Sequence, residues 1–184
     1  LFHLGIHNVH INCVFEDVWR EGDDILFEQQ MRQLADTIIG NRLYDDHVCT
    51  LFERSIGHPM DIENNRNWCG AGLMLAIDAR GVFYPCTRFA QYALRDKPAR
   101  AIGNVKEGIN KNIVRPFYSL SRTLQSNKEC IECPVASRCA WCQRANYDSA
   151  DSQTIFQRST AICKMHKARV RANAYYWNRI DENE

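Results

Sequence analysis

Hydrophobic and polar residues alternate near the start of the chain and then change to a helical period. In LGIHNVHINCV, the side chains of Val9, Ile11 and Cys13 fall on one face of an extended segment, and polar residues fall on the other. Along residues 25–39, hydrophobic residues recur every three or four positions. The two patterns predict one strand followed by one helix.

The ends of this helix are marked by residue types that commonly terminate helices. Asp23 or Asp24 is expected to cap its first turn, and Gly40 is placed to end it. A single strand and helix cannot bury both faces of the strand. We therefore interpret this stretch as one piece of a larger α/β domain.

A second pattern predicts a β-hairpin. The strand-like runs 74–78 and 82–84 flank a turn in which Gly81 can adopt a positive φ. Because a hairpin brings its two ends together, Cys69 before it and Cys86 after it are predicted to lie close in space. Other patterns predict a short strand and turn over 102–109, a short helix within 114–127 and a helix over 161–180.

The composition of the chain argues against nucleic acid and membranes as partners. The chain has 184 residues, of which 45% are hydrophobic and 24% charged, with a formal net charge of +1. This balance creates no field that would attract nucleic acid or an anionic membrane, so neither is expected as a partner. The longest apolar stretches, such as GLMLAI, are too short to span a bilayer.

The cysteines indicate a reducing compartment and a metal. Nine is an odd number, and most of the nine lie close together in the C-terminal half. A secreted disulfide framework is usually short and even-numbered, so a cytoplasmic location is expected. In KECIECPVASRCAWC, four cysteines form a C-x2-C-x5-C-x2-C array. This spacing suits tetrahedral zinc and iron-sulfur clusters equally well.

The order of the cysteines resembles that of the SPASM domain, the C-terminal extension of radical SAM enzymes that carries auxiliary [4Fe-4S] clusters. GVFYPC matches its G-x4-C element, and CIECPVASRC matches the spacing of its next three cysteines. CAWC has two residues where the family usually has three. NWCGAG, IGNV and ICKMHKARVRANAYYW also resemble SPASM peptide maturases, in particular those acting on repeated-cysteine precursor peptides.

The resemblance implies an α+β fold in two parts. Residues 1–62 would be the C-terminal remnant of a radical SAM (β/α) barrel. Residues 63–184 would be a SPASM-like domain with a β-hairpin, cysteine-rich loops and flanking helices. The implied function is to bind auxiliary clusters in an oxidoreductase that modifies a ribosomally made peptide, by thioether crosslinking at cysteine.

The resemblance also implies cofactors and partners. The chain has no C-x3-C-x2-C motif, so it lacks the ligands of the cluster that binds S-adenosylmethionine. That third cluster and S-adenosylmethionine would belong to a complete enzyme with the missing N-terminal barrel. Alone, the chain is expected to be inactive. Its other partner would be the precursor peptide.

Carried over residue by residue, the resemblance implies two ligand sets. One auxiliary cluster would be fully coordinated by four cysteines: Cys130, Cys133, Cys139 and Cys163. The other would be held by Cys69, Cys86 and Cys142, which leaves one iron open to a cysteine thiolate of the peptide. A carboxylate or His58 as fourth ligand would close this position.

A zinc domain is the alternative. His166 follows Cys163 by three residues, a spacing used by zinc ligands on helices, so the chain is alternatively a zinc-stabilised module that binds a peptide or protein without redox activity. Cys13, on the hydrophobic face of the first strand, is interpreted as a buried thiol, and Cys49 has no partner at motif spacing. The basic residues of the last helix are interpreted as a solvated face: Lys164, Lys167, Arg169 and Arg171.

Overall fold

The structure is a computed structural model that describes residues 1–64, 69–90 and 97–182. Two compact units are interleaved along the chain. Unit 1 comprises Leu1–Met60, Cys133–Ala140 and Ala161–Glu184, and unit 2 comprises Asp61–Glu132 and Trp141–Thr160. Both mix helices with small sheets, in agreement with the α+β fold class. Asn67 and Trp68 of the NWCGAG motif lie outside the described residues.

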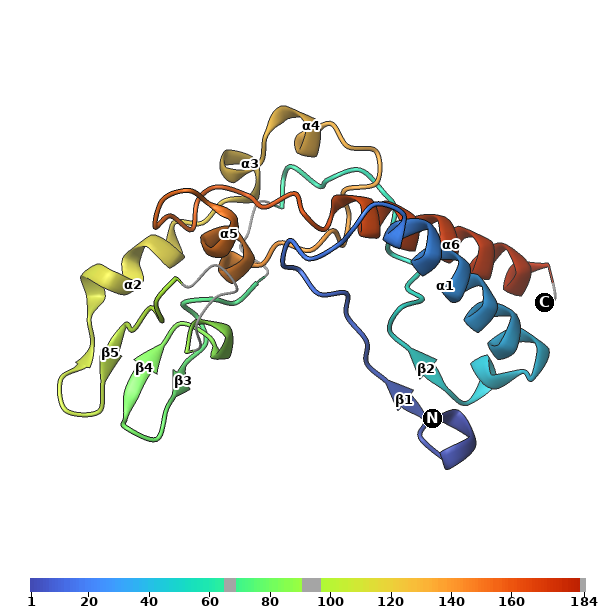
Figure 1. Cartoon of the computed structure of the whole chain (residues 1–184), viewed down its shortest axis with the longest axis horizontal. Coiled ribbons are helices and arrows are strands. Elements are labelled where there is room, and N and C mark those ends of the chain that lie inside the picture. The colour runs from blue at the N-terminus through green and yellow to red at the C-terminus, as the bar shows by residue number, and fades with distance from the viewer. Residues whose placement is uncertain (65–68, 91–96, 183–184) are drawn as a thin grey trace. The chain divides into compact units, whose positions relative to one another are not determined.

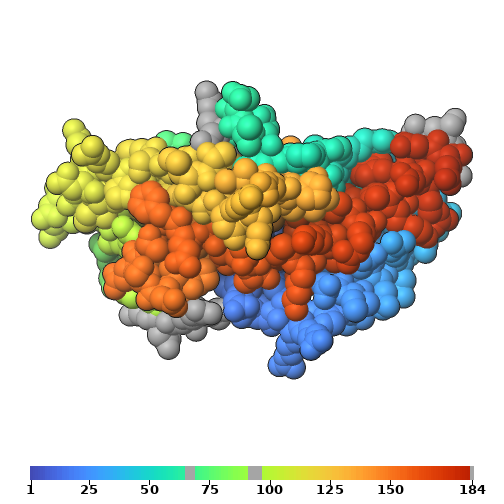
Figure 2. All heavy atoms as spheres, turned by 90° about the horizontal axis from the view of Figure 1, so that it is seen from above, coloured from blue at the N-terminus to red at the C-terminus, as the bar shows by residue number. Residues whose placement is uncertain are grey.

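Unit 1 is built on two long helices. α1 (Asp23–Gly40) and α6 (Cys163–Asp181) pack side by side, as Figures 1 and 2 show in blue and red. The predicted helix is confirmed, and most residues that recur along it lie in the core between the helices, although Ile25 and Leu26 are exposed. This core includes Met31, Ala35, Ile38, Ala172, Tyr176 and Ile180.

The predicted N-cap of α1 is wrong. Gly22, at φ 85°, occupies the cap position, and no side chain caps the helix. The carboxylate of Asp23 instead accepts a hydrogen bond from the amide of Arg20 at 2.7 Å. Asp23 and Asp24 therefore lie in the first turn, where their negative charges interact favourably with the helix dipole.

The first strand is shorter than predicted. β1 (Asn8–Val9) pairs in parallel with β2 (Val48–Cys49), and the ladder does not continue beyond Val9. The hydroxyl of Thr50 accepts the amide of Ile11 at 2.9 Å, so a side chain replaces the next strand partner. Ile11 is exposed as a result, although it lies on the same predicted face as the buried Val9.

Unit 2 contains a four-stranded antiparallel sheet. Its strands follow the chain order: β3 (Ala76–Ile77), β4 (Val82–Tyr84), β5 (Gly103–Asn104) and β6 (Gly108–Ile109). The predicted hairpin is confirmed, with Ala76 opposite Tyr84 and Gly81 at φ 77° in the turn. The carboxylate of Asp78 closes that turn by accepting the amides of Arg80 and Val82 at 2.9 and 3.0 Å.

Short helices surround the core of unit 2. In place of the one helix predicted within residues 114–127 there are two, the first of which begins before residue 114. The helical elements are η3 (Thr87–Phe89), α2 (Lys111–Tyr118), α3 (Arg122–Gln125), α4 (Lys128–Ile131) and α5 (Gln143–Ser149). The core is largely aromatic and includes Tyr84, Phe89, Phe117, Trp141 and Tyr147. Cys86 is part of this core, and Cys69 packs against it.

Two 3-10 helices precede the parallel strands of unit 1: η1 (Phe2–Leu4) lies before β1, and η2 (Leu43–Asp45) lies before β2. The loop 133–140 joins this unit from later in the sequence. Within residues 1–64, 69–90 and 97–182, every helix is too short or too polar to cross a lipid bilayer. The interpretation of 1–62 as a barrel remnant and 63–184 as a SPASM-like domain stays a prediction.

Candidate metal centre

Three of the predicted ligand thiols form one group in unit 2, which we call the thiol group. The side chains of Cys69 and Cys142 are hydrogen-bonded to each other. Cys86 lies close enough to both for their charges to interact. Cys69 precedes the hairpin, Cys86 follows it and Cys142 is the residue before α5, so three separate stretches of chain bring these sulfurs together.

Backbone amides surround the three sulfurs. Each sulfur accepts at least one main-chain hydrogen bond. The donors lie just after Cys69, in η3 and at the start of α5, and they are the amides of Ala71, Arg88, Phe89, Gln143 and Ala145. Amide donors stabilise negative charge on sulfur, and such bonds also tune iron-sulfur clusters. The local backbone is therefore suited to thiolates.

A guanidinium adds positive charge to the thiol group. Arg88 Nη1 donates to Cys142 Sγ at 2.9 Å. Burial raises the pKa of Cys86, and the nearby charge of Arg144, a side chain only 2% exposed that pairs with Asp148 at 3.0 Å, only partly opposes this rise. Sequence reasoning missed Arg88, although its place two residues after Cys86 was the available signal. The charge of the site is thus set by residues adjacent to the predicted ligands.

The contact between Cys69 and Cys142 makes their titrations interdependent. The hydrogen bond from Cys142 lowers the pKa of Cys69 to about 6. The same hydrogen bond, followed by burial, raises the pKa of Cys142 above its ordinary range. Burial raises the pKa of Cys86. In the metal-free chain the pair therefore holds one proton and one negative charge at neutral pH.

The donor chemistry of the thiol group fits a thiophilic metal. All nine cysteines lie in the described ranges and are thiols, not disulfides. Next to Cys142, the indole N–H of Trp141 is buried without an acceptor among the described residues. Leaving such a donor unpaired costs about 1–3 kcal/mol, so an acceptor bound at this site would remove a penalty. Soft thiolates select zinc and iron-sulfur clusters.

The thiol group is not arranged as a single-ion coordination sphere. Across the described part of the chain, no group of three or more His, Cys, Asp or Glu side chains is placed to hold a metal ion. The thiols of Cys69 and Cys142 contact each other directly, which a shared metal would prevent. Binding of a metal would therefore require the two side chains to separate.

The second predicted ligand set is distributed over both units. Cys133 and Cys139 lie in the loop 133–140 of unit 1, and Cys163 is the first residue of α6 in the same unit. All three are half-buried. Cys130 belongs to unit 2, where its amide donates to the side chain of Asn127 at 2.9 Å.

The two candidate histidine ligands are both in unit 1. A ring nitrogen of His166, Nε2, lies 2.6 Å from the carbonyl of Val135 in the loop 133–140. His58 is tied to the same loop by its main chain, since its carbonyl accepts the amide of Ser137 at 2.7 Å. Both histidines therefore contact the loop that carries Cys133 and Cys139.

The interpretation of the basic residues of α6 as a solvated face is wrong for Arg169, whose side chain is 18% exposed, whereas Arg171 is exposed and pairs with a carboxylate. Arg169 donates to the carbonyls of Leu51 and Thr50 at 2.9 and 2.6 Å. Arg171 donates to Glu28 at 2.5 Å. The helix pattern could not reveal these acceptors, because they come from distant parts of the sequence.

The two remaining cysteines lie outside the predicted ligand sets. Cys13, predicted to be buried, is only half-buried, and burial raises the pKa of its thiol. Cys49 is buried, and burial raises the pKa of its thiol too. Neither thiol belongs to the thiol group.

Comparison of the chain with protein-family models, with curated protein sequences and with solved structures returns no match. The resemblance to the SPASM domain thus rests on the order and spacing of the cysteines and on the short motifs around them.

Proposed function

We propose that this chain is the auxiliary [4Fe-4S] cluster-binding portion of a radical SAM enzyme that modifies a ribosomally made peptide. The observation that carries the proposal is the thiol group: Cys69, Cys86 and Cys142 come from three stretches of chain and lie together in unit 2. The SPASM resemblance assigns these three cysteines to one cluster. Their proximity supports this assignment, although the Cys69 and Cys142 side chains would have to separate to hold a cluster.

The residues around the thiol group have definite roles in this proposal. Cys69, Cys86 and Cys142 would hold one cluster, and Arg88 and the main-chain amides would stabilise the negative charge on their sulfurs. When bound, a cluster with an open iron supplies a Lewis-acidic position for a peptide thiol. Trp141 would provide an N–H donor and exclude water from this side.

The remaining parts of the proposal follow from the same assignment. Cys130, Cys133, Cys139 and Cys163 would hold the second cluster. The substrate would be a precursor peptide, crosslinked at cysteine through a thioether. A barrel with the C-x3-C-x2-C motif would supply S-adenosylmethionine and the third cluster, so we expect this chain to be inactive alone. Thiolate clusters persist in reducing compartments, which favours the cytoplasm.

The proposal is tested by measuring iron, acid-labile sulfide and zinc per chain after anaerobic reconstitution. Two [4Fe-4S] clusters give about eight iron atoms, and Cys69→Ala or Cys130→Ala should each remove about half of them. Cys49→Ala is the control, because this buried thiol lies outside both ligand sets. Iron without sulfide, or equal loss from all three variants, would contradict the proposal.

A zinc-stabilised binding module is the second candidate, and one contact favours it. His166 Nε2 lies 2.6 Å from the carbonyl of Val135. Metal-ligating histidines commonly donate one ring nitrogen to a main-chain carbonyl and coordinate through the other. Stoichiometric zinc with no sulfide in the same measurement, lost on His166→Ala, would establish this module.

A further inference from the structure

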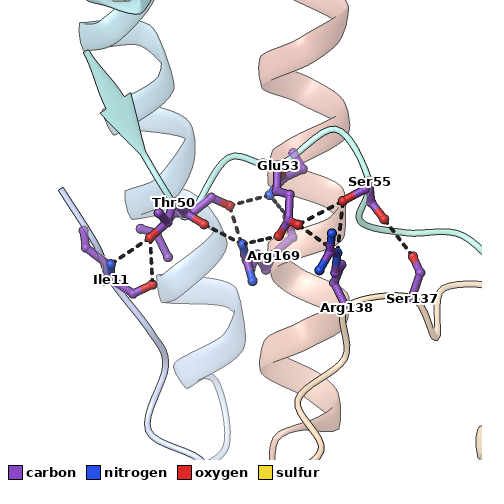
Figure 3. Close-up of polar contacts among 9 residues, drawn as sticks. Ile11, Thr50, Glu53, Ser55, Ser137, Arg138 and Arg169 are labelled. Carbon is purple, nitrogen blue, oxygen red and sulfur yellow. Dashed lines mark hydrogen bonds and ion pairs between the residues drawn. The ribbon is translucent and has the colours of Figure 1, made fainter. Parts of the chain in front are cut away.

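Polar contacts in unit 1 join three segments into a closed ring, and Figure 3 shows two of its three sides. The first segment is 50–58, which follows β2. The second is the loop 133–140, which carries Cys133 and Cys139 and is called the cysteine loop below. The third is the N-terminal half of α6, which begins at Cys163. None of the predicted cysteine ligands takes part in these contacts, but the cysteine loop and α6 carry Cys133, Cys139 and Cys163.

The first side of the ring joins segment 50–58 to the cysteine loop. Arg138 Nε lies 2.8 Å from Glu53 Oε1 and 3.1 Å from Ser55 Oγ. The hydroxyl of Ser137 donates to the carbonyl of Ser55 at 3.1 Å and accepts the amide of His58 at 2.8 Å. Arg138 has φ 58°, a left-handed conformation that a non-glycine residue adopts at a cost of about 1 kcal/mol or more. These bonds oppose that cost directly before Cys139.

The second side joins segment 50–58 to α6. Arg169 Nη2 donates to Thr50 O at 2.6 Å and to Glu53 Oε2 at 3.5 Å. Asn173 accepts the amide of Glu53 at 2.6 Å and donates to Leu51 O at 2.9 Å. Glu53 is therefore the residue at which the two sides meet.

The third side joins the cysteine loop directly to α6 through His166 and Val135. Between these segments lies a cavity of about 110 Å³. Its lining includes Arg138 and Ala140, which flank Cys139, and Ile162, which precedes Cys163. The backbone around both cysteines thus faces one cavity.

Glu53 is the carboxylate shared by two guanidinium groups in this ring. Its side chain is 33% exposed, while Arg169 is 18% and Arg138 is 59% exposed. Partial burial strengthens these pairs relative to fully exposed ones, and removal of the carboxylate would leave two like charges facing each other. Loss of Glu53 should therefore loosen the cysteine loop more than loss of an ordinary surface charge.

We propose that Glu53 is a positioning residue: it holds the cysteine loop against α6 and so reduces the movement that Cys133, Cys139 and Cys163 need to bind a metal. The role in metal binding rests on the proposed function. Residues that orient metal ligands from outside the coordination sphere typically change metal affinity by about 10–100-fold when removed. Preorganisation of this kind lowers the ordering that binding requires.

The test compares Glu53→Gln with Glu28→Gln, a matched carboxylate in the same unit. Glu28 also accepts from two arginines, Arg32 at 2.8 Å and Arg171 at 2.5 Å, and bridges α1 to α6. In the metal-free chain, hydrogen exchange at the Ser137 amide should accelerate about tenfold in Glu53→Gln and stay near the parent value in Glu28→Gln. After reconstitution, iron release to a chelator should accelerate about 10–100-fold only in Glu53→Gln.

Arg138→Gln is the second variant, because it breaks the loop side of the ring and leaves the contacts of Arg169 in place. It should reproduce both effects of Glu53→Gln. Equal exchange at Ser137 in Glu53→Gln and Glu28→Gln overturns the holding role. Faster exchange with unchanged iron release overturns the role in metal binding. If the parent chain binds neither iron nor zinc, the proposed function and the role of Glu53 in metal binding are both refuted. Hydrogen exchange at the Ser137 amide would still decide whether Glu53 holds the cysteine loop in place.

Discussion

The two sets of predicted ligand thiols are held by different physical means. In unit 2, Cys69 and Cys142 are hydrogen-bonded to each other, and the nearby Cys86 is part of the hydrophobic core. In unit 1, Cys133, Cys139 and Cys163 lie on segments joined by ion pairs and hydrogen bonds. Burial of hydrophobic surface depends little on salt, whereas ion pairs between partly exposed groups are screened by it. The two sets should therefore respond to different perturbations.

The largest effect is expected from Gly72→Ala, which disturbs the core of unit 2. Gly72 has φ 86°, and a Cβ there would lie 2.4 Å from Cβ of Phe117. The left-handed backbone and the overlap together should lower the free energy of unfolding by roughly 3 kcal/mol, measured by urea denaturation.

Gly108→Ala is the control for this prediction. Gly108 has φ 76°, but a Cβ there would meet nothing within 4 Å, so only the backbone cost of about 1 kcal/mol is expected. Hydrogen exchange at Ser137 in unit 1 should be unchanged in both variants. Accelerated exchange there in Gly72→Ala would show that the two units do not respond separately.

A smaller effect concerns the protonation of the thiol group. In the metal-free chain, the hydrogen bond from Cys142 lowers the pKa of Cys69 to about 6. Because folding lowers this pKa, the associated stabilisation is present above the ordinary thiol pKa and is lost as the pH falls toward 6. Iodoacetamide should modify Cys69 roughly tenfold faster than Cys49 at pH about 7, as measured by mass spectrometry of peptides.

Cys142→Ala tests the cause of this reactivity. Removing the hydrogen-bond donor should raise the pH midpoint of alkylation at Cys69 toward the ordinary thiol value. An unchanged midpoint would mean that the main-chain amides of Ala71 and Gln143 suffice to hold the thiolate.

The smallest effect is expected from salt. Raising sodium chloride from about 0.05 M to about 0.5 M shortens the screening length roughly threefold. The Ser137 amide donates to His58 O at 2.7 Å. Hydrogen exchange at this amide should accelerate about two- to fivefold as the ion pair of Glu53 and Arg138 weakens. Exchange at the amide of Phe89, a core residue of unit 2, should not change. Equal responses would remove the distinction between the two units.

Local signals in the sequence predicted much of the secondary structure. The period along residues 25–39 predicted α1, and Gly81 predicted the turn of the hairpin. Both depend on residues close in sequence. The N-cap prediction failed because the Asp23 carboxylate accepts the amide of Arg20 and caps no amide of the helix. Residue types alone do not decide which nearby amide such a carboxylate accepts.

The candidate site was accessible to sequence reasoning only where a motif marked it. The SPASM resemblance put Cys69 and Cys142 in one ligand set, and their side chains are hydrogen-bonded in the structure. Their roles as ligands stay a prediction. No sequence pattern indicated a role for Glu53, because its partners Arg138 and Arg169 are distant from it in the sequence. The solvated face expected for Arg169 failed for the same reason: a helix pattern shows which residues share a face but not what covers it.

The packing of α1 on α6 has a consequence for biosynthesis. Unit 2 is built mainly from the continuous stretch Asp61–Glu132, but unit 1 needs Ala161–Glu184 to cover the hydrophobic stripe of α1. At ordinary translation rates, α6 leaves the ribosome on the order of ten seconds after α1. During that interval Met31, Ala35 and Ile38 have no partner helix, so the nascent chain should present a binding segment to chaperones until its last helix emerges.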